Sequence, residues 1–170
     1  FFIKENKDLE KLRVAGYNVR QKLDKNTTEI TLVGNGEQAL ALAEGLALSN
    51  YQFLKYFSDA DVKEYQLEVI NMVTDLTAQE INEMNQVIQA VIWARDMVNE
   101  PSSYLSAVQL AREIQEIGDE AHLNVQVLNK KTIQDLKMGG LLAVNLGSIE
   151  PPTFTIIEHK PENPINSKPI

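Results

Sequence analysis

The stretch TAQEINEMNQVIQAVIWARDMVNEP, residues 77–101, decides how this chain is organised. Thr77 and Glu80 have the spacing of a capping box, in which a hydroxyl and a carboxylate satisfy the free amides at a helix start. Apolar residues then recur at helical spacing, until Pro101 disfavours helical geometry in the residue before it. The pattern predicts a helix over 78–98, about 30 Å long, which is long enough to join two lobes.

On the amino-terminal side of this helix, the sequence alternates between helical and strand patterns. The expected elements are a helix over 7–23, a strand over 29–33, a helix over 37–49, a loop over 51–64 and a short buried strand over 66–73. Gly16 falls inside the first helix, where glycine costs about 1 kcal/mol relative to alanine. We therefore expect Gly16 to allow close packing or a local break.

The carboxyl-terminal side repeats the alternation. The expected elements are a helix opened by a second capping box at Ser106–Gln109, a strand over 123–128, a short helix over 131–137 broken by Gly139–Gly140, and a strand over 153–157. Residues 141–146 fit either a strand or a buried helix, because periodicity does not separate the two in so short a run. The tail from Lys160 reads as a loop. Alternation of this kind predicts an α/β fold with mainly parallel strands.

The composition argues against several classes of function. The chain has 170 residues, a net charge of -8, two histidines and no cysteine. Without cysteine there is no disulfide, thiolate metal site or thiol nucleophile. The negative charge and the lack of basic clusters argue against nucleic-acid binding. The apolar runs fall far short of the ~20 residues that span a membrane. Neither end carries a targeting signature, and we expect both ends to be cut from a longer protein.

Several acidic and histidine residues are candidates for a chemical site. Asp59 and Asp61 could hold a divalent cation, but the surrounding loop offers few further oxygens, so solvated carboxylates are the favoured interpretation. Glu158–His159 follows a strand, where a ligand or base could lie. A lone histidine is more often ordinary, and His122 has no second ligand at metal spacing.

Three further features have simple structural explanations. Gly34–Asn35–Gly36 precedes a helix as a phosphate loop does, but lacks the third glycine and the lysine–serine ending, so a turn explains it better. Ser148 follows Gly147 but lacks the second glycine of a nucleophile elbow. Trp93 has no basic residues interleaved and is expected in the core. The residues themselves therefore contain no catalytic constellation.

Read as a whole, the sequence resembles the cytosolic leucine aminopeptidase family of metallopeptidases. The carrying segments, in order, are ARDMVNEP at 94–101, AVQLA at 107–111, LKMGGLLAV at 136–144, Gly147–Ser148 and Pro151–Pro152. Further matches are Ala43–Gly45, Tyr51–Phe53, Arg13 and Gly16, which are similar to the family's amino-terminal domain. Each motif is modest alone, whereas their order and spacing together are specific.

The resemblance implies a metal-dependent aminopeptidase that hydrolyses amino-terminal residues, with leucine preferred, from peptides. Two divalent ions, Mn or Zn, would activate a water and polarise the scissile carbonyl. In this family the metal-binding segment begins with a glycine-lysine-glycine strand, which would come after Ile170. We therefore assign no catalytic, metal-binding or substrate-binding residue in this chain, expect no metal bound to it, and expect the chain alone to be inert.

The resemblance also implies an architecture. Residues 1–77 would be the later part of an amino-terminal macro-like domain, 78–98 a connecting helix, and 99–170 the first part of a mixed-sheet α/β peptidase domain. A cytoplasmic homo-oligomer, a hexamer, would follow, with peptides as substrates and no nucleic-acid or membrane partner. The alternative is a non-catalytic α/β binding or oligomerisation module, based on the macro-like half and the long helix.

Overall fold

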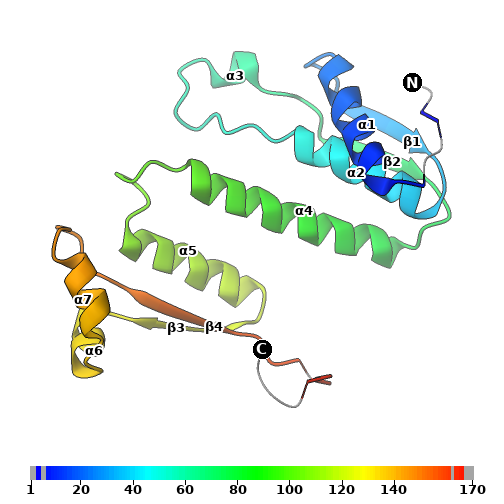
Figure 1. Ribbon diagram of the computed structural model, residues 1–170. Coiled ribbons are helices and arrows are strands. Elements are labelled where there is room, and N and C mark those ends of the chain that lie inside the picture. The colour runs from blue at the N-terminus through cyan, green and yellow to red at the C-terminus, as the bar shows by residue number, and fades with distance from the viewer. Residues whose placement is uncertain (1–2, 5–6, 162, 167–170) are drawn as a thin grey trace. The chain divides into compact units, whose positions relative to one another are not determined.

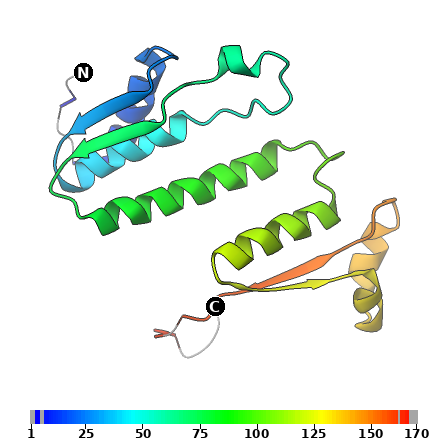
Figure 2. The ribbon, with the colours of Figure 1, turned by 180° about the vertical axis from the view of Figure 1, so that it is seen from behind.

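The computed structural model describes residues 3–4, 7–161 and 163–166, so the outermost residues of both expected cut ends lie outside the described part. The chain divides into two compact units, residues 1–99 and residues 100–170. Each unit combines helices with a small two-stranded sheet, as Figures 1 and 2 show. The predicted α/β class is confirmed.

The first unit contains four helices and two strands in the described residues. They are α1 (Leu9–Lys22), β1 (Glu29–Val33), α2 (Gly36–Ser49), α3 (Ala60–Lys63), β2 (Val69–Val73) and α4 (Ala78–Asn99). The two strands are parallel, with Glu29 opposite Val69 and Val33 opposite Val73. The short α3 lies inside the segment that the sequence predicted as a loop. The predicted helices and strands otherwise occur within a few residues of their expected bounds.

The helices α1 and α2 pack with their backbones in direct contact. A Cβ atom added to Gly16 would lie 2.3 Å from the carbonyl oxygen of Leu42, and one added to Gly45 would lie 2.0 Å from that of Arg13. No side chain fits at either distance, so glycine at both positions is what lets the helices approach. The expectation that Gly16 allows close packing is confirmed.

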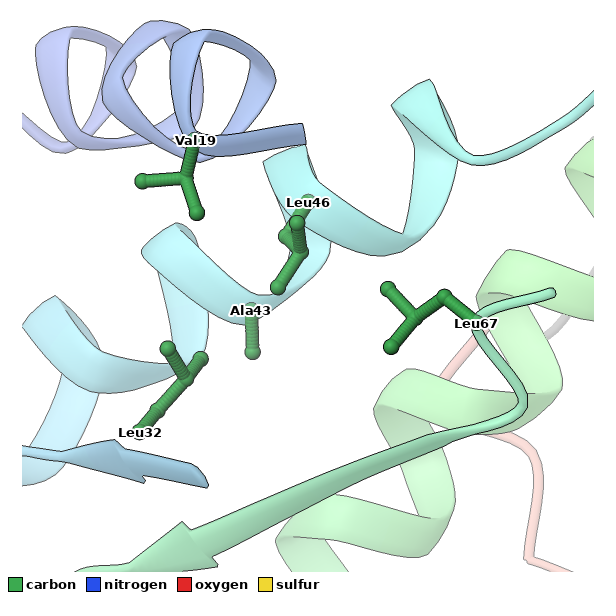
Figure 3. Packing of buried hydrophobic residues seen from close by; sticks show 5 residues of the cluster. All are labelled: Val19, Leu32, Ala43, Leu46 and Leu67. Carbon is green, nitrogen blue, oxygen red and sulfur yellow. The ribbon is translucent and has the colours of Figure 1, made fainter. Parts of the chain in front are cut away.

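The buried core of the first unit lies between α1, α2 and the inner face of the sheet. Its members are Val19, Leu32, Ala43, Leu46 and Leu67 (Figure 3). The prediction of a buried strand over 66–73 is wrong in part. The strand begins at Val69, and Val69 and Val73 are 45% and 59% exposed. They share the outer face of the sheet, whereas Ile70 and Met72 point toward the core.

The long helix α4 begins at the predicted capping box. The Thr77 backbone amide donates to Glu80 Oε2 at 2.8 Å, and the Glu80 amide donates to Thr77 Oγ1 at 3.3 Å. Both halves of the box are therefore formed. The Thr77 amide, and after it the Thr77 hydroxyl, which donates to Glu80 Oε2 at 2.7 Å, hold the pKa of Glu80 below its usual value. Trp93, which was expected in the core, is half-buried on this helix.

The second unit has three helices and two strands in its described part. They are α5 (Ala107–Glu120), β3 (Asn124–Leu128), α6 (Lys130–Asp135), α7 (Gly139–Asn145) and β4 (Phe154–Glu158). The prediction of mainly parallel strands is wrong here, because β3 and β4 are antiparallel, with Leu128 opposite Phe154. The chain leaves β3 through two short helices and re-enters at the same end of the sheet, so β4 must run back.

Two local predictions in this unit are corrected. Ser106 Oγ accepts from the Gln109 amide at 3.3 Å, but the Gln109 side chain donates to Glu113 instead of returning, so only half of the second capping box forms. Gly139 and Gly140 begin α7 rather than ending a helix, which decides the open choice for residues 141–146 in favour of a helix. That helix has no buried residue among those described.

Within residues 3–4, 7–161 and 163–166, no helix combines the length and the apolar character that crossing a membrane requires.

Candidate functional site

The two acidic residues at the start of α3, Asp59 and Asp61, lie at the surface. Asp59 Oδ1 pairs with Lys63 Nζ at 3.0 Å, one helical turn later. Asp61 is exposed on the short helix. The carboxylate of Asp59 is therefore engaged by a lysine, and the interpretation of both residues as ordinary surface carboxylates is supported.

The residues at the end of β4 form a surface ion pair. Glu158 Oε2 lies 3.0 Å from Lys160 Nζ and accepts a hydrogen bond from Asn124 Nδ2 at 3.2 Å. These two partners lower the pKa of Glu158, which is the opposite of what a general acid at neutral pH needs. The neighbouring His159 is exposed. His122 occupies the turn between α5 and β3 with φ 55°, so its backbone serves the turn.

The turn at residues 34–36 is closed by a carboxylate. Asp75, which follows β2, accepts a hydrogen bond at 2.6 Å from the Gly36 amide at the start of α2. This bond is the largest cause of the lowered pKa of Asp75. The free amide that a phosphate would use is thus already satisfied by the chain itself. Gly36 is needed for its φ of 50°, which L-residues rarely adopt.

Ser148 also has a structural partner. Its hydroxyl accepts a hydrogen bond from the Glu150 amide at 3.1 Å and so shapes the turn before Pro151. Among the described residues, no group of three His, Cys, Asp or Glu side chains is gathered as a metal ion would require. The described residues therefore do not fit a divalent metal centre.

Neither of two cavities lined by described residues contains an acid–base pair. One, of about 650 Å³, lies beside β1 and is walled mainly by apolar side chains of β1, α1 and α2, including Leu12, Ile30 and Leu42. The other, of about 310 Å³, lies between α5 and the Pro151–Pro152 segment, with Arg112 and Lys130 among its lining residues. Apolar walls with at most two cations suit packing or binding rather than catalysis.

A cluster of long-range polar contacts in the first unit joins α4 to the end of α2. The Tyr51 hydroxyl donates to Asp96 Oδ1 at 2.8 Å, and Asn99 Nδ2 donates to the same hydroxyl at 3.0 Å. Arg95 Nη1 donates to the Leu48 carbonyl oxygen at 2.6 Å. Burial is the main cause of the raised pKa of Tyr51, and Asp96 adds to it. We call these five residues the Tyr51 cluster.

This cluster connects two of the motifs quoted for the family resemblance, Tyr51–Phe53 and 94–101. The Asp96 carboxylate and the Asn99 amide orient the Tyr51 hydroxyl. The arrangement therefore suits a structural role rather than catalysis. The resemblance marked both segments, but their contact spans 45 residues of sequence and no local pattern predicts it. The buried Arg20, stacked over Tyr65, was likewise missed, because a single arginine in a helical pattern looks like a solvated one.

Comparison with solved structures finds the same fold within larger enzymes. The bottromycin maturation enzyme BotP in complex with Mn superposes with a TM-score of 0.77 at 25% identity, over 91% of this chain and 34% of that one. A mutant of tomato leucine aminopeptidase gives 0.77 at 22% identity, over 89% of this chain and 33% of that one, and shows the fold alone.

The sequence comparisons match cytosol aminopeptidases over part of their length. The model of the cytosol aminopeptidase family, catalytic domain, matches residues 92–170. A probable cytosol aminopeptidase of Sulfurihydrogenibium is 28% identical over 89% of this chain and 32% of its own length. The corresponding protein of Chlorobaculum parvum is 56% identical over 69 residues, 41% of this chain and 14% of its own. Together these matches support a partial chain of the cytosol aminopeptidase family, which spans about a third of the Sulfurihydrogenibium protein.

Proposed function

We propose that this chain forms part of a metal-dependent aminopeptidase that hydrolyses amino-terminal residues, leucine preferred, from peptides. The observation that carries the proposal is the match of residues 92–170 to the catalytic domain of the family. The relatives named as probable cytosol aminopeptidases support it across the chain's length. The proposal extends to the 170 residues taken alone, which we propose to be catalytically inert.

The side chains of the described residues support the proposed inertness. A peptidase of this class needs metal ions to activate water and polarise the scissile carbonyl. No set of carboxylates or histidines suited to them gathers in the part of the chain that the structure describes. We propose that the two ions, Mn or Zn, are held by regions of the longer relatives that this chain does not span. Manganese in the BotP structure supports that choice of metal.

The proposal assigns roles to three segments. Residues 1–77 would be the later part of a macro-like amino-terminal domain, 78–98 the connecting helix and 99–170 the start of the peptidase domain. A cytoplasmic hexamer remains the expected assembly of the whole enzyme. The naming of the relatives as cytosol aminopeptidases supports the location.

A chimera tests the functional proposal. The 69 matched residues of the Chlorobaculum parvum relative would be replaced by those of this chain. We expect the chimera to hydrolyse leucine p-nitroanilide with added Mn²⁺ at a kcat/KM within about tenfold of the unmodified relative. The unmodified relative is the positive control. A chimera that folds and assembles as its parent does, yet has no activity, would contradict the proposal.

A further inference from the structure

The match to the catalytic domain begins inside α4, at residue 92. Residues 92–99 nevertheless belong to the first compact unit, which ends at Asn99. The last turns of α4 are therefore both the start of the peptidase-family segment and part of the packing of the first unit. The contacts that fix residues 92–99 therefore also fix the position of the first residues of the peptidase-family segment.

Three side chains of these turns contact one small region of the first unit. Asp96 and Asn99 are three residues apart, which places them on the same helix face, and both bond the Tyr51 hydroxyl. Arg95 reaches the Leu48 carbonyl and its guanidinium lies 5.5 Å from the centre of the Tyr51 ring.

The contact at Leu48 answers a need of α2. The last carbonyl groups of a helix have no partner within the helix. At the end of α2 the Asn50 amide satisfies the carbonyls of Leu46 and Ala47, and Arg95 satisfies that of Leu48. A cation at a helix carboxyl end also complements the helix dipole. Arg95 thus joins the carboxyl-terminal turns of α4 to the end of α2.

We propose that Arg95, Asp96 and Asn99 are positioning residues, which fix the carboxyl-terminal turns of α4 through Tyr51 and Leu48. The first unit would thereby set the geometry at which the peptidase-family segment begins. The inference uses the family match but does not depend on the proposed aminopeptidase activity. The amino-terminal part of α4 has separate anchors, the Thr77–Glu80 capping box and the buried Ile88. The two ends of one helix are therefore held independently.

Native-state hydrogen exchange on the full 170-residue chain tests the proposal. Tyr51→Phe removes the hydroxyl and both of its bonds but keeps the ring. We expect the amides of residues 96–99 to lose about tenfold in protection, because two bonds that oppose local opening are gone. The amides of residues 84–88 in the same helix should keep theirs. Tyr17→Phe, at a half-exposed tyrosine of α1, is the matched control and should change neither group.

Conservative substitution distinguishes positioning from general destabilisation. Asp96→Asn retains an oxygen that accepts from Tyr51, so we expect it to keep most of the protection that Asp96→Ala loses. Asp96→Ala added to Tyr51→Phe should cost little more than Tyr51→Phe alone, since both remove the same bond. Asn99→Ala, at an exposed residue, removes one bond only and should give a smaller loss at the same amides.

Three results would overturn the proposal. The first is unchanged protection at residues 96–99 in Tyr51→Phe. The second is an equal loss along the whole of α4, which would mean that Tyr51 supports only global stability. The third is a double variant whose loss is the sum of its single losses, which would mean that Tyr51 and Asp96 act separately. If Tyr51→Phe unfolds the chain, the same comparison of the two ends of α4 is made on Asn99→Ala.

Discussion

At the residue scale, Arg20 is the one buried charged side chain in the described part of the chain, with 1% of its surface exposed. Its guanidinium lies 3.6 Å from the centre of the Tyr65 ring, and Nη1 donates to the Leu23 carbonyl at 3.5 Å. Nε and Nη2 have no hydrogen-bond partner among the described residues. The ring face and the carboxyl end of α1 stabilise the charge, while the unbonded nitrogens cost free energy.

This balance predicts different outcomes for two substitutions of Arg20. Arg20→Ala removes a packed stem and should lower the free energy of unfolding by about 2–4 kcal/mol. Arg20→Met keeps much of that volume and removes two unbonded donors, so it should stay within about 1 kcal/mol of the parent chain. Urea unfolding followed by circular dichroism measures both. Equal losses would show that the guanidinium has strong partners that the described contacts do not account for.

At the element scale, the contact between α1 and α2 and the closure of the turn before α2 shape the first unit. The contact depends on glycine where the backbones touch, and the turn depends on the Asp75 carboxylate, which follows the neighbouring strand β2. Both features join segments distant in sequence. Each therefore offers a substitution whose effect the geometry decides.

Gly45→Ala should separate the two helices, because the new Cβ would lie 2.0 Å from the Arg13 carbonyl oxygen. Overpacking of this kind costs about 1–3 kcal/mol or more. The matched control is Gly140→Ala in α7, where an added Cβ meets nothing within 4 Å. Alanine in an exposed helix is favourable by up to about 1 kcal/mol, so the control should be neutral or stabilising. Thermal unfolding of the two variants gives the comparison, and a tolerated Gly45→Ala would contradict the packing described.

Asp75 makes stability depend on pH in the acid range. The Gly36 amide lowers the pKa of Asp75 in the folded chain. A group whose pKa falls on folding contributes stability above its unfolded value, about 3.9, and loses it as the pH falls through the folded value. We expect Asp75→Asn to flatten the decline of Tm below about pH 4. The Tm values of parent and variant, measured from pH 7 down to acid, test this, and parallel curves would show that Asp75 is not involved.

Local pattern predicted these elements well where the signal is itself local. The capping box at Thr77, the alternation at 29–33 and the Ala/Leu-rich run before Ser49 each determine their own element. Local sequence pattern did not predict features that depend on contacts with residues distant in sequence. The direction of β4 depends on where the chain returns after α7, and the exposure of Val73 depends on what covers the outer face of its sheet.

At the scale of the whole molecule, the two units differ in how much of the buried core and how much of the family match they contain. The first contains the Tyr51 cluster and most of the buried core, and the second contains most of the match to the catalytic domain. The family could be predicted from the order of short motifs along the chain. The contact between Tyr51–Phe53 and 94–101 could not, because it arises only when α4 packs beside α2.

An activity assay of the chain alone tests the proposal that these 170 residues are catalytically inert. The 170-residue chain would be assayed on leucine p-nitroanilide with Mn²⁺ or Zn²⁺, beside a leucine aminopeptidase as positive control. We expect no hydrolysis above that of the metal ion alone. The described residues contain no group of side chains that could bind the metal ions and so activate a water. Turnover that rises in proportion to the concentration of the pure chain and is lost on chelation would contradict it.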